Sequence, residues 1–94
     1  MATRTRSDVN LIQHDNYSVG TGAVIKTPIT PANFIFVRNL DTTNSLLISF
    51  DSGANFFSIV AGAVLSFDVD GLINYTIKSS AGTVATECLY GRAV

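Results

Sequence analysis

The sequence predicts an all-β fold: a single antiparallel β-sandwich or small barrel of about seven strands, with an extended N-terminal arm. Apolar and polar residues alternate with a period of two along most of the chain, as in half-buried strands. Turn-forming residues recur about every ten residues, and no window has the period of a helix. The 94 residues suffice for one domain at most. We therefore expect an arm over residues 1–20 and a sandwich domain over residues 21–94.

The N-terminal segment has no strand pattern. Met1 and Val9 are isolated among Thr, Arg, Ser, Asp and Asn, so residues 1–10 have too little apolar area to order by themselves. Two interpretations remain open for the arm. It is either a frayed terminus or a segment that orders against a neighbouring subunit.

The domain begins with a turn at the glycines of residues 19–23, and further turn signals follow. Gly provides the positive φ of tight turns, and Asp and Asn hydrogen-bond their own backbone there. Between the turns, residues 45–51 and 72–79 alternate most clearly. We expect Leu46, Ile48 and Phe50, and then Ile73, Tyr75 and Ile77, to face inward, and Ser49 to face outward. Over residues 83–90 either face could be the buried one. The predicted strands are residues 22–27, 33–40, 45–51, 54–60, 63–69, 72–79 and 83–90.

One predicted strand is apolar on both faces. Residues 34–37 place Phe34 and Phe36 on one side and two aliphatic residues on the other. Because one face of a sandwich sheet normally meets water, either a loop or another subunit covers such a strand. It is then the central strand beneath the N-terminal segment, or it is a subunit interface. Phe56 and Phe57 belong to a second two-faced patch, which favours the interface.

Composition excludes several classes of protein. With 47% hydrophobic and 14% charged residues, the chain is too apolar for a disordered tail. Polar residues interrupt every apolar stretch before the length of about 18 residues that a membrane-spanning helix needs, so we predict no membrane insertion. Arg4 and Arg6 precede no apolar segment, so we predict no secretion signal. The basic residues are scattered, which excludes a nucleic-acid-binding cluster.

The residues that carry chemistry are few. His14 has no accompanying nucleophile motif, and Cys88 occupies a strand position typical of a small buried hydrophobic residue. A single cysteine forms no internal disulfide and fits a reducing cytoplasm. Asp68 and Asp70 precede a glycine but lack the further oxygen ligands of a calcium loop. We therefore expect no catalytic residue, no cofactor and no metal.

A carbohydrate-binding module is an alternative, because small β-sandwiches often present aromatic rings to sugars. The chain has no Trp. Its tyrosines, Tyr17, Tyr75 and Tyr90, are far apart in the sequence, and at least one is expected in the core. An enzyme or an enzyme inhibitor is a more distant alternative.

The middle of the chain resembles small structural proteins of tailed bacteriophages. The resemblance lies in residues 30–44, which contain Arg38-Asn-Leu-Asp41, followed by Leu47-Ile-Ser-Phe-Asp-Ser-Gly53. In these phage proteins a strand ending in Val-Arg-Asn-Leu-Asp turns into a hairpin with an apolar strand. Residues 61–67 and 79–83 resemble later elements, so that the resemblance covers roughly residues 22–90. Ala63 stands where such a family carries glutamate.

The resemblance implies a non-enzymatic virion structural protein, foremost a capsid cement or decoration protein that oligomerises, typically as a trimer, and bridges capsomers of the phage head. The alternative within this class is a small tail, baseplate or head-tail connector component. Its partners would be the major capsid protein or other virion proteins, and its location the virion, assembled in the host cytoplasm. The residues implicated are Phe34, Phe36, Phe56 and Phe57 for core or intersubunit packing, and Arg38 with Asp41 for the hairpin corner.

Overall fold

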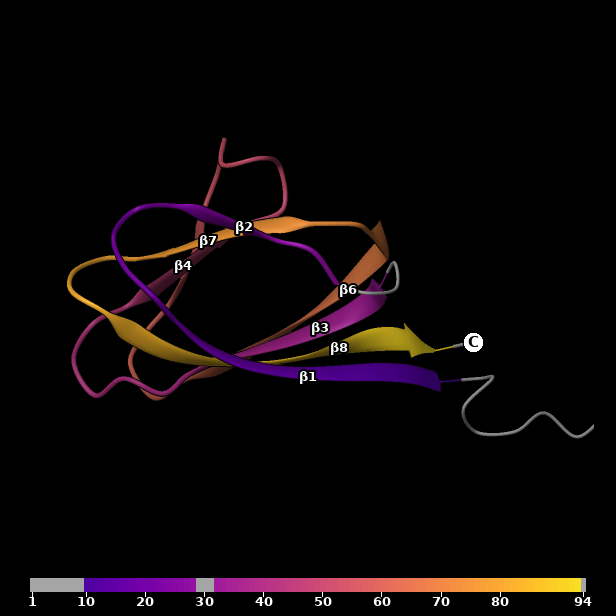
Figure 1. Ribbon diagram of the computed structural model, residues 1–94, viewed down its shortest axis with the longest axis horizontal. Coiled ribbons are helices and arrows are strands. Elements are labelled where there is room, and N and C mark those ends of the chain that lie inside the picture. The colour runs from indigo at the N-terminus through magenta and orange to yellow at the C-terminus, as the bar shows by residue number, and fades with distance from the viewer. Residues whose placement is uncertain (1–9, 29–31, 94) are drawn as a thin grey trace, which may run out of the picture.

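The computed structural model describes residues 10–28 and 32–93, which form two four-stranded sheets packed face to face (Figure 1). All neighbouring strands are antiparallel, and the described residues contain no helix. The first sheet has the order β1-β8-β3-β6 and the second β2-β7-β4-β5, which is the strand order of a jelly roll. The strands are β1 (Asn10–Val19), β2 (Val24–Lys26), β3 (Ala32–Asn39), β4 (Leu46–Ser49), β5 (Phe57–Ile59), β6 (Val64–Leu72), β7 (Tyr75–Ser79) and β8 (Val84–Ala93).

The core lies between the two sheets and is built from alternate positions of the strands. On β3, Ile35 and Val37 point inward and are fully buried. On β8 the inward face consists of Val84, Thr86, Cys88 and Tyr90, which resolves the register that the sequence left open. The remaining fully buried apolar side chains come mainly from the second sheet: Leu46, Ile48, Ile59, Tyr75 and Ile77.

The predicted all-β sandwich is confirmed, and each predicted strand overlaps an observed one. Two predictions of the direction in which a side chain points were wrong. Ile73 is 64% exposed because it lies between β6 and β7 rather than within a strand. Ser49 is buried, since its hydroxyl donates to Asp51 at 2.7 Å and accepts from the N–H of Gly53 at 2.9 Å.

The predicted boundary at residue 20 is wrong for residues 10–19. These residues form β1, which pairs along its whole length with β8 and is therefore an integral strand of the first sheet. Its inward positions carry Gln13, Asp15 and Tyr17, and these polar side chains hide the alternation that would reveal a strand. The rest of the predicted arm, residues 1–9, lies outside the described residues.

Candidate functional site

The outward side chains of the first sheet form a shallow groove that crosses all four of its strands. The groove has a volume of about 280 Å³. Strand register explains it, since His14 on β1, Leu89 on β8 and Phe36 on β3 form one row across the sheet. The lining residues are His14, Phe36, Arg38, Val64, Glu87 and Leu89.

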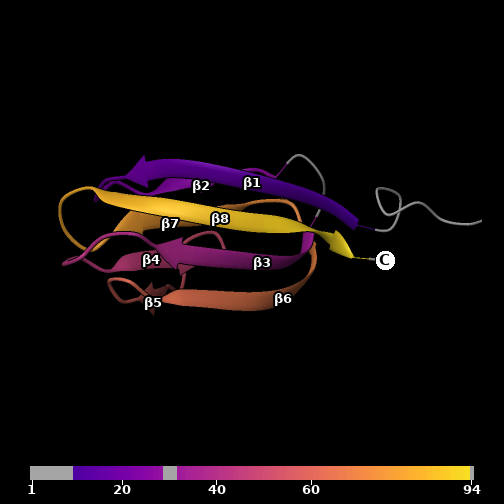
Figure 2. The ribbon, with the colours of Figure 1, turned by 90° about the horizontal axis from the view of Figure 1, so that it is seen from below.

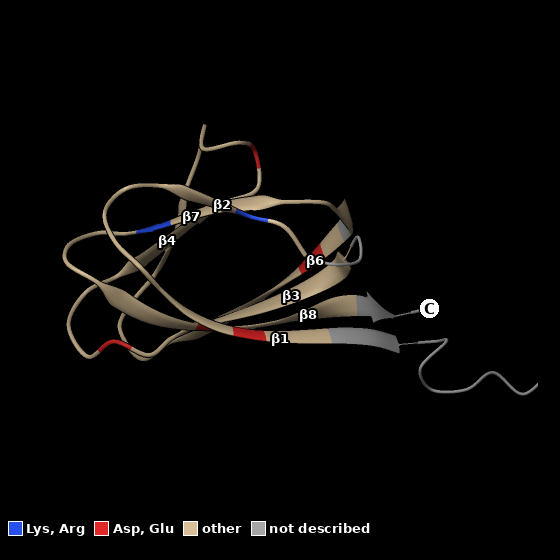
Figure 3. Cartoon of the chain, viewed as in Figure 1, with Lys and Arg blue, Asp and Glu red and all other residues tan. Residues whose placement is uncertain are grey.

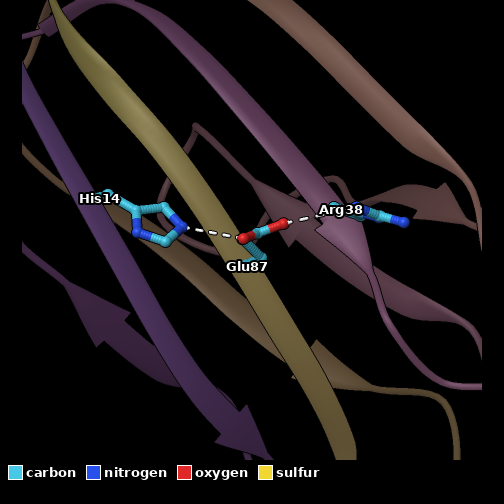
Figure 4. A network of polar contacts seen from close by, with 3 residues as sticks. All are labelled: His14, Arg38 and Glu87. Atoms are coloured by element: carbon cyan, nitrogen blue, oxygen red, sulfur yellow. Dashed lines mark hydrogen bonds and ion pairs between the residues drawn. The ribbon is translucent and has the colours of Figure 1, made fainter.

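One carboxylate links three strands within this groove (Figure 4). Glu87 on β8 lies between His14 on β1, with Nε2 and Oε2 2.9 Å apart, and Arg38 on β3, with the nearest nitrogen and Oε1 3.7 Å apart. About half of the His14 side chain and more than half of the Arg38 side chain are exposed, so solvent screens both contacts. The groove can receive an apolar or charged group, but none of its lining side chains is an activated nucleophile.

The four phenylalanines implicated by the sequence do not form a single cluster. Phe34 and Phe36 lie on the outward face of β3, with ring centroids 6.1 Å apart in an edge-to-face arrangement. Phe57 on β5 is 52% exposed. Phe56 is half-buried, and the Lys78 ammonium lies 4.6 Å from its ring centroid. All four therefore lie outside the fully buried core.

The strands β5 and β6 form one border of the sandwich (Figure 2). Exposed apolar side chains lie on this border. We call this border the β5/β6 flank. The Phe67 ring on β6 packs against the Phe50 and Phe57 rings, with centroids 4.9 Å and 5.5 Å away. Val64 and Leu65 at the start of β6 are also exposed. The flank thus presents an apolar edge to solvent.

The opposite border, which we call the β1/β2 flank, is also apolar. Val24 and Ile25 on β2 are exposed, Ile25 by 69%. The Lys26 ammonium lies 4.2 Å from the centroid of the Tyr17 ring. This contact connects β2 with β1 of the other sheet. The two flanks lie on opposite sides of the molecule (Figure 2).

A cluster of polar side chains is enclosed between the sheets behind β1. The Tyr17 hydroxyl lies 2.7 Å from the Tyr75 hydroxyl and 3.3 Å from the Cys88 sulfur, and Tyr75 donates to the same sulfur at 3.6 Å. Beside them, the Tyr90 hydroxyl donates to Asp15. Burial raises the pKa of the Cys88 thiol and of the tyrosines. Cys88 is therefore a protonated, fully buried thiol, which is a poor nucleophile.

The corner after β3 is held by a different pair of residues from the pair implied by the sequence. Asp41 does cap the turn, since its carboxylate accepts the N–H groups of Thr43 at 3.1 Å and Asn44 at 2.6 Å. These backbone hydrogen bonds lower the pKa of Asp41. Arg38 points outward into the groove toward Glu87, so the prediction that it helps to fix the corner was wrong.

Asn39 takes that place and was missed. Its side chain is fully buried and donates to the carbonyls of Asn44 and Ile59, each at 2.9 Å, while its amide oxygen accepts the N–H of Asp41 at 2.8 Å. The bond to Ile59 joins the end of β3 in the first sheet to β5 in the second. Its signal in the sequence is a polar residue that the strand alternation places on the inward face.

The structure shows no grouping of residues for metal or membrane functions within the part of the chain it describes. No three His, Cys, Asp or Glu side chains in that part lie close enough to hold a metal ion. Residues 10–28 and 32–93 contain no helix long and apolar enough to cross a membrane. Of the tyrosines considered for sugar binding, Tyr75 and Tyr90 are buried and Tyr17 is half-buried.

Neither a protein-family model nor a curated protein matches the chain. Among solved structures, it is similar to a chain of the Bacillus endospore appendages, which are described as a novel family of disulfide-linked pili. The TM-score is 0.53 with 17% sequence identity, over 90% of this chain and 88% of that chain. At this identity the similarity shows a shared fold.

The resemblance to structural proteins of tailed bacteriophages was therefore wrong, because the similar structure belongs to a bacterial pilus. The residues that carried it are explained by local physics, since Arg38-Asn-Leu-Asp41 is the end of a strand followed by a capped turn. Any antiparallel sandwich can contain such a corner. The predicted capsid partners, trimer and virion location depended on that resemblance and stay untested.

Proposed function

We propose that this protein is a non-enzymatic structural subunit that assembles with copies of itself. The observation that carries the proposal is the exposed apolar surface on both flanks, with Val24 and Ile25 on one side and Phe57, Val64 and Leu65 on the other. Apolar surface gathered in this way marks an interaction surface on a water-soluble domain. Charged residues are few and scattered (Figure 3), so little electrostatic repulsion opposes association.

The fold similarity supports the same class of function, because the Bacillus chain belongs to pili, which are assemblies of protein subunits. The two proteins differ in how their subunits can be joined, because the Bacillus pili are disulfide-linked. Joining a subunit to two neighbours by disulfides requires two cysteines, and these 94 residues contain only Cys88. That thiol is fully buried between the sheets. The proposed assembly is therefore non-covalent.

The chemistry of the described residues supports a role without catalysis. The most nucleophilic side chain, Cys88, is held protonated by burial. His14 is paired with Glu87 on an open sheet surface, where no nucleophile lines the groove. What the surface offers is contact area, which fits a protein that acts by binding.

Sedimentation velocity over a range of protein concentrations, combined with negative-stain electron microscopy, tests the proposal. We expect assemblies that grow with concentration. Phe57→Lys should raise the concentration needed for assembly about tenfold or more, because a charge would be desolvated on the β5/β6 flank. Ile73→Lys is the matched control, since Ile73 is 64% exposed, against 52% for Phe57, but lies between β6 and β7. A protein that stays monomeric at every concentration would contradict the proposal.

A further inference from the structure

We infer that the copies join head to tail, with β6 of one copy pairing with β1 of the next, so that the first sheet continues from subunit to subunit. This inference rests on the proposed self-assembly and specifies its geometry. The partner is a second copy of this chain, and the contact is made by backbone hydrogen bonds between edge strands.

The directions of the strands permit this pairing. β1 and β6 are the two edges of one antiparallel sheet and lie on opposite borders of the molecule (Figure 2). Because that sheet has four strands, its edge strands run in opposite directions. A copy placed alongside by translation, without being turned over, therefore brings its β1 antiparallel to β6. The same argument applies to β5 and β2 at the edges of the second sheet.

The two edges of the first sheet are long and carry little of the usual protection against pairing. β1 has 10 residues and β6 has 9, and among the described residues each pairs with a strand on one side only. Neither strand contains Lys or Pro, the residues that commonly block edges. A register shift between Ala32 and Phe34 makes the end of β6 irregular, which leaves residues 64–68 as its regular pairing segment.

The rows of the outward face give the register of the contact. Ser66 on β6 lies in the same row as Phe36, Leu89 and His14. Translation along this row places His14 of the next copy directly beside Ser66. The neighbouring row likewise places Asn16 of the next copy beside Val64.

The same placement brings the apolar flanks together. Across the second sheet, Phe57 lies in the same row as Val24, so Phe57 of one copy then faces Val24 of the next, and water is excluded from both. Each copy adds four strands to the first sheet, which gives a repeat of about 19 Å at the usual spacing between strands. Because the two contacting surfaces differ, the contact is heterologous, and sheet twist makes an open assembly helical.

Cysteine cross-linking of the full chain tests the pairing. His14→Cys and Ser66→Cys in one chain should give, after mild oxidation, a ladder of cross-linked multimers on a non-reducing gel, which collapses to monomer on reduction. Directly opposed edge residues have the short Cβ separation that a disulfide requires. Each single variant alone should run as a monomer on the non-reducing gel, because it has no partner cysteine at the contact. An equimolar mixture of the two single variants should give a cross-linked dimer and nothing larger. Wild type, whose only cysteine is the buried Cys88, is the control.

The outcomes separate this inference from the proposed function. A second double variant carries Asn16→Cys with Val64→Cys. If the protein assembles in sedimentation but neither double variant gives a ladder on the gel, head-to-tail pairing is overturned and self-assembly is left standing. Ser66→Cys dimers formed from that variant alone would show two-fold pairing of β6 and would also overturn it. Absence of any assembly by wild type would overturn both. Circular dichroism confirms that each variant is folded, and the second cysteine pair replaces the first if one variant unfolds.

Discussion

Removing the Asn39 side chain should destabilise the fold more than its small size suggests. Asn39 is fully buried and makes three hydrogen bonds to backbone groups, to the carbonyls of Asn44 and Ile59 and from the N–H of Asp41. Asn39→Ala leaves all three groups without this partner. A buried polar group that loses its partner costs about 1–3 kcal/mol.

The three lost bonds differ in how well water can replace them. The bond to Ile59 is buried, whereas those to Asn44 and Asp41 are partly accessible. We therefore count the first at full cost and the others at a fraction, and expect a loss of about 2–4 kcal/mol in the free energy of unfolding. That is a large share of the roughly 5–15 kcal/mol typical of a domain.

Urea unfolding followed by circular dichroism measures this loss, with all variants at one protein concentration because association would add stability. Arg38→Ala is the matched control, since Arg38 is the adjacent residue on the exposed face and should change stability by about 0.5 kcal/mol or less. If Asn39→Ala were no more destabilising than Arg38→Ala, the Asn39 bonds would not hold the corner together and the reasoning would fail.

Two further predictions concern buried and capped side chains. Cys88 should not react with a thiol reagent in the native protein, because its side chain is fully buried and its pKa is raised. It should become reactive only as urea unfolds the domain. Rapid labelling without urea would contradict its burial. Asp51 has its pKa lowered from 3.8 to about 2, with the hydrogen bond from Ser49 as the largest cause. It should therefore stabilise the fold above about pH 4 and lose this effect as the pH falls from about 4 to about 2. The difference in melting temperature between wild type and Asp51→Asn should shrink over that range, and a constant difference would refute the assignment.

The strands were predictable where local pattern and burial agree. In β7, Tyr75 and Ile77 alternate with polar residues and both are buried, so the period of two located the strand. β1 was missed because its inward positions are polar and find partners far away in the sequence. Asp15 accepts from Tyr90, and Tyr17 contacts Tyr75. Such a strand looks like a polar arm until the residues that satisfy its polar groups are known.

The candidate assembly surfaces were only partly predictable for a related reason. The sequence indicated that Phe57 belongs to an apolar surface, and it is exposed. Which strands lie at the edges depends on long-range pairing, since β8 at the C-terminal end inserts between β1 and β3. No local pattern carries that order. The same holds for Asn39, whose role depends on the Ile59 carbonyl 20 residues away.

The contrast between the two sheets argues that growth is guided by the first sheet. The edges of the second sheet, β2 and β5, are three residues each, and short edges are a common protection against pairing. The first sheet has edges about three times as long. An inward-pointing charge can also protect an edge strand, but the Asp15 carboxylate on β1 already accepts a hydrogen bond from the Tyr90 hydroxyl of its own subunit. The edges of the second sheet are therefore protected against pairing with another strand, whereas the edges of the first sheet are only weakly protected. This difference is expected if the first sheet sets the direction of assembly and the second adds apolar contact beside it.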